Sequence, residues 1–420
     1  MKRFLALAPL LVLLSACRGE HQDIELRFWA MGRESEILEQ LMPAFEREHP
    51  GVHVRVEQLP WTAAHAKLLT AVAGDSTPDL CQLGNTWVAE LADLGALKAL
   101  DGDLSRSDAV PATDYFPGIW RTNQIGTRQY GVPWYVDTRL LFYRKDILAA
   151  AGYASVPTDW AGFKVMLAKI RAQSHGERYG ILLPLNEYEP ILALALQSET
   201  PVLKEQGTRG NFSNPDFVAA FSYYISLFDD ALAPPVTNSQ ISNVWNEFAR
   251  GYFAFYITGP WNIGEFRRRL PPALAGHWGT APLPGPHGPD ASIAGGASLA
   301  VFKRTQHPAE AWALVEYLSR PAVQERFYAL TGDLPARRSV WETASVKDDP
   351  MTAAFREQLE RVRPAPAVAE WEEIMTELRL MAEHVVRHEL TPAEGAAELD
   401  RRADRMLAKR RELVHAGRLP

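Results

Sequence analysis

Five of the twelve tryptophans lie at or just after segments that the sequence predicts to be strands: Trp29, Trp61, Trp87, Trp134 and Trp261. Loops at the ends of strands are the places where open α/β sheets hold their ligands. An indole ring there can cover the apolar face of a bound molecule, but tryptophan is also a frequent core residue. The sequence leaves both roles open for each of the five.

Motifs for catalysis or metal binding are not found. His384 and His388 are four residues apart on a predicted helix, but the string HVVRH lacks the glutamate of an HExxH zinc site. The chain contains no GxSxG elbow, no P-loop and no CxxC pair. We therefore expect no metal, no cofactor and no enzymatic activity, and we interpret the two histidines as part of a polar helix face.

The first 17 residues have the layout of a secretory signal. Lys2 and Arg3 precede an apolar run from Phe4 to Leu14, which is too short to span a bilayer. The string LSAC that ends at Cys17 resembles a bacterial lipobox. This predicts a signal peptide over residues 1–16, a lipid on Cys17, a tether over residues 17–23 and a protein anchored outside the cytoplasm at the cell envelope. An uncleaved anchor and an ordinary secreted protein are the alternatives.

The composition is that of a globular, mildly acidic protein. The 420 residues carry a formal charge of −7, and loss of Lys2 and Arg3 with the signal would change it to −9. This argues against nucleic acid as a partner, because phosphate binding needs clustered basic residues. The basic stretch 401–418 is interrupted by acids and indicates a solvated helix face. If Cys17 is lipidated, Cys81 has no disulfide partner, and its apolar neighbours predict that it is buried.

The hydrophobic periods predict alternating strands and helices. Residues 24–30 and 52–59 alternate as strands, and 79–83 form a short strand. Residues 34–49 follow a helical period in which Pro43 should kink the helix or shift its start, and 61–73 are predicted to form a second helix. Further strands are predicted in 131–143, 180–183 and 251–257, and a helix after Pro157 is predicted to be capped by Thr158. The Gly- and Pro-rich stretch 276–289 is predicted to be a loop, and 351–414 is mostly helical. The pattern indicates an α/β fold.

Six blocks in order resemble family 1 extracellular solute-binding proteins, the sugar-capture subunits of ABC importers. The blocks are FWAMGRESE with FEREHPGVHVRV, TPDLCQLGNTW, YGVPWYVDTRLLFYRKDIL, PTDWAGF, GYFAFYITGPWNIGEF, and LPGPHGPDASIAGGASLAVFK followed by AEAWALVEYLSRPAVQERFYALTGDLPAR. The resemblance implies a periplasmic-binding-protein type II fold, with two hinged α/β lobes, a ligand cleft between them and a helical C-terminal extension. It places the N-terminal lobe at 24–136 plus 290–335 and the C-terminal lobe at 137–289 plus 336–420.

The resemblance also implies that the protein binds a sugar, and it indicates which residues form the binding site. A sugar offers hydroxyls at its edge and a C–H face, so its site needs aromatic rings beside carboxylates, amides or arginines. The candidate binding residues are Arg33, Glu34, Trp61, Asn85, Trp87, Trp134, Asp137, Trp245, Trp261, Gly295, Gly296, Arg337 and Trp371, with Tyr188 as a weaker candidate. Asp137 matches a position that binds sugar hydroxyls, but it could instead cap a turn at the hinge. Glu34 could equally be a helix first-turn acid.

The implied partners are a sugar ligand and the permease subunits of an importer, with the protein itself a monomer. Two other classes stay open. A secreted glycoside hydrolase needs a carboxylate pair whose separation in space the sequence does not reveal. A binding protein for another solute, such as a glycerol phosphate or a polyamine, would need more basic or more acidic residues in the cleft than the sequence places there.

Overall fold

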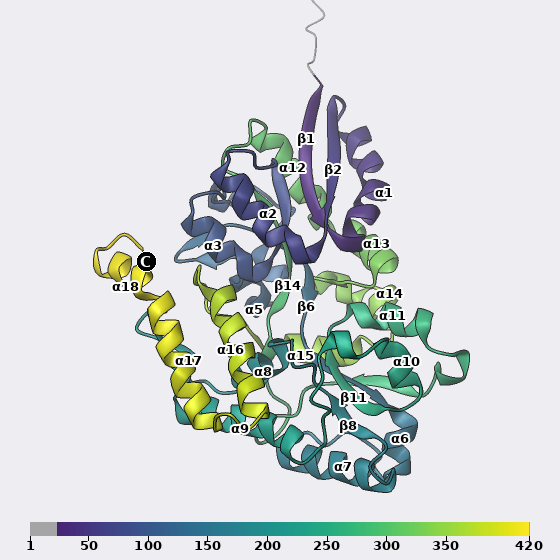
Figure 1. The fold of residues 1–420 in the computed structure, drawn as a ribbon. Coiled ribbons are helices and arrows are strands. Elements are labelled where there is room, and N and C mark those ends of the chain that lie inside the picture. The colour runs from purple at the N-terminus through teal and green to yellow at the C-terminus, as the bar shows by residue number, and fades with distance from the viewer. Residues whose placement is uncertain (1–22, 420) are drawn as a thin grey trace, which may run out of the picture.

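The computed structural model describes residues 23–419, which form two α/β lobes (Figure 1). The predicted signal peptide, Cys17 and most of the tether lie outside the described residues. The first lobe contains β1 (Ile24–Met31), β2 (Val52–Leu59), β3 (Leu80–Gly84), β6 (Val132–Asp137), β14 (Gly295–Val301) and β15 (Leu334–Pro335). They form one sheet in the order β15-β6-β14-β3-β1-β2.

The second sheet has the order β12-β7-β11-β8. Its strands are β7 (Leu140–Arg144), β8 (Tyr179–Leu182), β11 (Phe253–Thr258) and β12 (Trp278–Ala281). Short pairs are formed by β4 (Gln124–Ile125) with β5 (Arg128–Gln129), β9 (Leu203–Lys204) with β10 (Arg209–Gly210), and β13 (Ser292–Ile293) with β16 (Val362–Arg363). β12 corrects the prediction of a loop over 276–289: its backbone pairs antiparallel with β7, and Trp278 is buried.

Helices cover both sheets (Figure 1). The first part of the chain forms α1 (Gly32–Glu48), α2 (Trp61–Ala73), α3 (Val88–Asp93), α4 (Asp101–Leu104), α5 (Pro117–Arg121), α6 (Lys145–Ala150), α7 (Trp160–Gln173), α8 (Glu189–Ala195) and α9 (Pro215–Asp229). The remainder forms α10 (Val244–Ala249), α11 (Trp261–Arg269), α12 (Pro308–Ser319), α13 (Pro321–Thr331), α14 (Ala344–Lys347), α15 (Ala353–Leu359), α16 (Trp371–Val386), α17 (Pro392–Met406) and α18 (Ala408–His415). Short 3₁₀ turns include η1 (Asn85–Trp87) and η5 (Arg338–Glu342).

Alternate side chains of β1 pack into hydrophobic clusters on the two opposite faces of the first sheet. Leu26 and Phe28 belong to the hydrophobic cluster on one face of the first sheet, whereas Trp29 and Met31 belong to the cluster on the other face. Successive side chains of a strand point to opposite faces, so both faces can bury apolar residues under helices. The predicted strand–helix alternation over residues 24–83 and the burial of Cys81 are confirmed.

Two local predictions differ from the structure. Asp159, not Thr158, caps α7, because its Oδ1 accepts the Gly162 N–H at 2.8 Å. α1 begins at Gly32, before the predicted start at residue 34, and it contains Pro43 in its interior. The φ of +56° at Gly32 suits a residue without a side chain.

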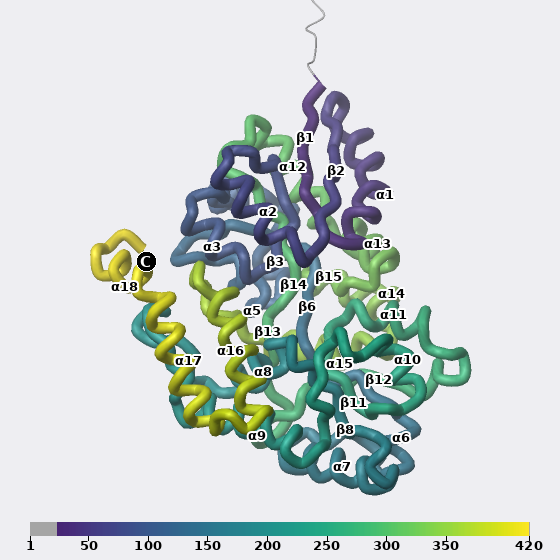
Figure 2. The backbone as a smooth tube through the Cα atoms, in the orientation of Figure 1, coloured from purple at the N-terminus to yellow at the C-terminus, as the bar shows by residue number. Residues whose placement is uncertain are grey.

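The chain passes between the two sheets at the waist of the molecule (Figure 2). β6 lies in the first sheet and β7 in the second, so Thr138 and Arg139 connect the lobes. The segment from β13 to β14 returns to the first sheet, and after β15 the chain reaches α15, which packs on β12 and β7. η5 and α14 pack against α13 on the way. α16 and α17 lie side by side, and both pack against α9.

Within residues 23–419, no helix has the length and apolar character needed to cross a membrane. In the same range no group of three or more histidine, cysteine or acidic residues is arranged to hold a metal ion. His384 bonds the carboxylate of Glu389 at 2.5 Å and is half exposed.

Candidate functional site

A cleft of about 540 Å³ lies between the two lobes. We call it the acidic cleft, because five carboxylates line it and Arg139 is the basic residue among the lining side chains that the structure describes. Its lining residues are Glu34, Trp61, Gly84, Asn85, Thr86, Trp87, Tyr135, Val136, Asp137, Thr138, Arg139, Tyr188, Glu189, Leu192, Pro260, Trp261, Ile293, Gly295, Gly296, Asp333 and Glu372.

Helix N-termini form much of the edge of the acidic cleft. The first turns of α1, α2, α8, α11 and α16 supply the five side chains Glu34, Trp61, Glu189, Trp261 and Glu372. In α/β units the carboxyl end of a strand leads to a helix N-terminus at the same edge of the sheet. Acidic side chains are favoured there because the N-terminal end of a helix carries partial positive charge. The fold therefore gathers acids and indole rings from both lobes around the cleft.

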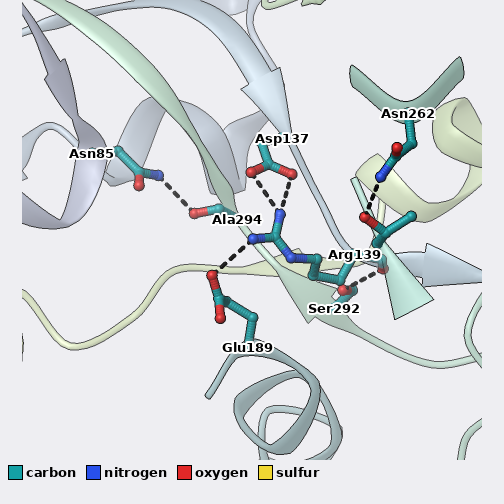
Figure 3. A network of polar contacts seen from close by, with 8 residues as sticks. Asn85, Asp137, Arg139, Glu189, Asn262, Ser292 and Ala294 are labelled. Carbon is teal, nitrogen blue, oxygen red and sulfur yellow. Dashed lines mark hydrogen bonds and ion pairs between the residues drawn. The ribbon is translucent and has the colours of Figure 1, made fainter. Parts of the chain in front are cut away.

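Arg139 lies at the centre of a charged network in the connection between the lobes (Figure 3). Its Nη1 donates to both carboxylate oxygens of Asp137, at 2.6 and 2.7 Å, and its Nη2 donates to Oε1 of Glu189 at 2.9 Å. Burial lowers the pKa of Arg139, but the two carboxylates outweigh this and raise it. The guanidinium stays charged and holds both acids in fixed orientations.

A second polar chain runs beneath Glu34. The Tyr135 hydroxyl donates to Oε1 of Glu34 at 2.8 Å, and the side-chain amide of Gln82 donates to the Tyr135 oxygen at 2.9 Å. Burial raises the pKa of Glu34. Burial and the nearby charge of Glu34 raise the pKa of Asp333 to about 8, so Asp333 holds a proton at neutral pH. This part of the cleft offers both an acceptor carboxylate and a protonated carboxyl group.

The aromatic rings of the cleft come from both lobes. Trp61 and Trp261 are large apolar residues that remain 37% and 38% exposed. Trp87 meets Trp61 edge to face, with 5.6 Å between ring centroids. The Arg139 Cζ lies 4.7 Å from the Trp261 ring centroid, so the charged network and the ring adjoin. Gly259 makes room for this ring, since a Cβ there would overlap it.

Gly295 and Gly296 lie where β14 pairs with the end of β6. A Cβ on Gly295 would approach the Asp137 carbonyl oxygen to 2.6 Å, and one on Gly296 would approach the Tyr135 carbonyl oxygen to 2.3 Å. Gly296 also has a φ of +133°. The two glycines therefore allow the backbone of β14 to approach the connection between the lobes.

The structure places three of the tryptophans singled out in the sequence in the core rather than in the cleft. Trp134 and Trp371 are each 1% exposed. Trp134 is on a strand whose neighbours are buried, and its ring lies 4.4 Å from that of Phe327. Trp371 begins α16, but its ring turns into the apolar cluster of the second lobe, and the adjacent Glu372 lines the cleft instead. Trp29 is likewise buried.

Three further predicted residues also do not line the cleft. Arg337 forms a buried ion pair with Asp114, with 2.6 Å between Nε and Oδ2. Arg33 donates to the Leu330 carbonyl at 3.0 Å. Trp245 donates to Oδ1 of Asn262 at 3.0 Å and lines a small neighbouring pocket that it shares with Trp261. In each case a hydrogen bond to a residue elsewhere in the chain holds the side chain away from the cleft.

The other predicted residues line the cleft: Glu34, Trp61, Asn85, Trp87, Asp137, Tyr188, Trp261, Gly295 and Gly296. Sequence reasoning missed Arg139, Glu189, Asp333 and Glu372. Glu189 and Glu372 carried a signal, since each is an acid at the start of a helical segment. Arg139 follows the predicted Asp137 by two residues. Asp333 had no local signal, because its place depends on the return of the chain after α13.

This arrangement suits an uncharged, hydroxyl-rich ligand. Ionised carboxylates accept hydrogen bonds from hydroxyls, and exposed indole faces cover C–H surface. Arg139 is already paired with two acids, so it is not a free partner for an anion.

Known proteins share this sequence and architecture. Residues 32–325 match the family model for bacterial extracellular solute-binding proteins. The solved sugar-binding protein MalE of Xanthomonas citri is 50% identical, with a TM-score of 0.90 over 93% of this chain and 99% of that chain.

More distant relatives agree with this match. The GacH receptor of Streptomyces glaucescens, solved unliganded and with acarbose, is 28% identical, with a TM-score of 0.80 over 91% and 98% of the two chains. The diacetylchitobiose binding protein DasA of Streptomyces coelicolor is 26% identical over 71% of this chain and 72% of its own length. These neighbours confirm the predicted type II periplasmic-binding fold. The chain belongs to the bacterial extracellular solute-binding protein family.

Proposed function

We propose that this protein captures a sugar or oligosaccharide for an ABC importer and releases it unaltered to a membrane permease. The observation that carries the proposal is the acidic cleft, in which oriented carboxylates adjoin exposed tryptophans from both lobes. The printed names of the relatives, MalE and DasA among them, support a saccharide ligand.

Capture follows from the position of the cleft. Glu34 and Trp61 belong to the first lobe, whereas Glu189 and Trp261 belong to the second. A ligand that contacts both sets binds best when the lobes are closed about Thr138 and Arg139. Binding then shifts the population toward the closed form, which is the form that a permease can distinguish from the empty one.

A ligand panel tests this proposal. We expect maltotriose or another oligosaccharide to bind with one-to-one stoichiometry in calorimetry. At a concentration of 100 times Kd it should stabilise the protein by about 2.7 kcal/mol in a thermal-shift experiment. Chromatography of the incubated ligand should recover it intact. Released monosaccharide would instead indicate a glycoside hydrolase.

Two charged solutes complete the panel. Glycerol 3-phosphate should not bind in the acidic cleft, because Arg139 is neutralised by Asp137 and Glu189. Spermidine is the stronger competitor, since the acidic residues lining the cleft outnumber Arg139 even with Asp333 protonated. Tighter binding of spermidine than of every saccharide would replace the sugar proposal with a polyamine function.

The proposed lipid on Cys17 would keep the protein near its permease. The experiment is fractionation of cells that express the full chain. The natural protein should be recovered with membranes, and the Cys17→Ser variant should not. Equal recovery of both with membranes would exclude the thiol as the anchor.

A further inference from the structure

A second cavity adjoins the acidic cleft at Asn85 and Thr86, which line both. Its volume is about 750 Å³. At this shared wall the Asn85 side-chain amide donates to the Ala294 carbonyl at 2.7 Å (Figure 3). We call the second space the arginine cavity, after Arg121, Arg363 and Arg410, which line it from three separate segments of the chain.

The charge of the arginine cavity is opposite to that of the acidic cleft. Glu199 is the acid among its lining residues in the described part of the chain. Arg410 is 4% exposed and pairs with Asp93 at 3.0 Å, while its buried Nε has no partner among residues 23–419. Asp93 offsets Arg410, which leaves Arg121 and Arg363 against Glu199. An excess of positive charge is unusual in a protein whose formal charge is −7.

Arg363 is held in place with donors to spare. Its Nη1 donates to the carbonyls of Leu196 and Ser198, and its Nε and Nη2 have no hydrogen-bond partner among residues 23–419. Arg121 is exposed in the last turn of α5. A guanidinium that is held by hydrogen bonds to backbone carbonyls is already oriented for a carboxylate or phosphate. Little side-chain freedom is then lost when the anion binds.

Apolar residues form another part of the wall. Pro201, Val202 and Leu203 face the cavity from one segment, and Pro364, Ala365 and Pro366 face it from the segment after β16. The volume falls within the range of small-molecule sites, about 300–1,000 Å³. A bare inorganic ion would leave most of this space and its apolar wall unused.

We propose that the arginine cavity is a second binding site, for a small organic anion with a carboxylate or phosphate head and an apolar body. The head contacts the guanidinium groups of Arg121 and Arg363, and the body packs on the proline-rich wall. This site is separate from the proposed sugar cleft and does not depend on it.

Three probes of similar size test the proposal: benzoate, phenyl phosphate and benzyl alcohol. Each is titrated at constant ionic strength by calorimetry and ligand-observed NMR. The anions should bind at least about tenfold more tightly than the alcohol, since charge-assisted hydrogen bonds are the strongest available there. The order of benzoate and phenyl phosphate identifies the head group. Equal binding of the alcohol, or no binding of either anion, would overturn the proposal.

Variants locate the site. Arg121→Gln and Arg363→Gln should each weaken benzoate binding about tenfold. Glu199→Gln should strengthen it about threefold, because it removes a like charge, and damage to the fold would not produce that gain. Arg304→Gln is the control, since this exposed arginine lines neither cavity and pairs with Asp75. Benzoate affinity that is unchanged in Arg121→Gln and Glu199→Gln would exclude this cavity.

Titration of the same variants with maltotriose separates the two proposals. Retained maltotriose binding in a variant that has lost benzoate would support the arginine cavity as a separate site. Loss of both ligands together, in a variant that remains folded by circular dichroism, would contradict a separate site.

Discussion

The acidic cleft and the arginine cavity lie on either side of Asn85, yet they use charge in opposite ways. In the cleft, Arg139 is enclosed by Asp137 and Glu189, so that the acids become oriented acceptors. In the cavity, Arg121 and Arg363 exceed the acid beside them. The difference follows from the elements at each edge. Helix first turns favour acids at the cleft, whereas Arg121 occupies the last turn of α5, where a basic residue is favoured.

The comparison teaches that the type of a residue does not tell whether it is available to a ligand. Arg139 and Arg363 both line cavities near the connection between the lobes. The donors of Arg139 are directed to carboxylates, whereas those of Arg363 are partly directed to neutral carbonyls. Only the second arrangement leaves net positive charge for an anion.

The largest effect is expected for Arg139→Met. The variant leaves the carboxylates of Asp137 and Glu189 without their partner, which should lower the free energy of unfolding by about 3 kcal/mol or more. Maltotriose binding should weaken as well, because the acids lose their orientation. Urea unfolding and calorimetry measure both. Arg268→Met, at an exposed pair with Glu265, is the matched control and should cost less than about 1 kcal/mol. A variant as stable as this control would contradict the role of Arg139.

Of the two proposed binding sites, Trp261→Ala should affect the acidic cleft alone. Removal of this exposed ring should weaken maltotriose binding by about 2 kcal/mol, as expected for a large aromatic contact. Benzoate binding should stay the same, because Trp261 does not line the arginine cavity. Calorimetry with both ligands gives the comparison. Unchanged maltotriose affinity would remove Trp261 from the proposed site, and a parallel loss of benzoate would mean that the two sites are not distinct.

The pH dependence of stability should arise in the cleft. Asp333 has a pKa of about 8 in the folded state, against 3.8 in the unfolded chain, so the folded state binds the extra proton between these values. Stability should therefore fall as pH rises from about 4 to 8, by up to about 2 kcal/mol between pH 6 and 8. Urea unfolding across this range should show a shallower slope for Asp333→Asn. Parallel pH profiles for the natural protein and this variant would contradict the raised pKa.

The arginine cavity should not share that pH dependence. Arginine stays protonated throughout the range, so benzoate affinity should change by less than about twofold between pH 6 and 8. The pH profile of benzoate affinity is therefore compared with the pH profile of the free energy of unfolding. A strong pH dependence of benzoate binding would place the anion beside the carboxylates of the cleft instead.

The smallest effect is expected for Asn85→Ala, at the boundary between the two spaces. Loss of the bond to the Ala294 carbonyl should lower the free energy of unfolding by about 1 kcal/mol. Because Asn85 lines both cavities, the affinities for maltotriose and benzoate should both change, each by less than about tenfold. Gln306→Ala, at an exposed residue, is the control. A change in only one of the two affinities would show that Asn85 does not contribute to both binding sites.

Much of the fold could be predicted because its signals are local. The alternation in β1 and the helical periods of α1 and α2 arise from neighbours a few residues apart. β12 was missed because its four residues lie among glycines and prolines and form a strand only by pairing with β7, more than 130 residues earlier. Thr158 and Asp159 both have suitable side chains for capping, and only the backbone geometry chose between them.

The sequence by itself determined the family resemblance, most of the order of strands and helices, and the placement of several tryptophans at strand ends. Tertiary structure decided which of them face a cavity. Trp134 and Trp261 are both tryptophans predicted at or just after a strand, but Trp134 packs on Phe327 and Trp261 stays exposed at the start of α11. Arg337 is held by Asp114, 223 residues away. Side-chain exposure and charge pairing are properties of contacts between distant segments, and a local pattern does not encode them.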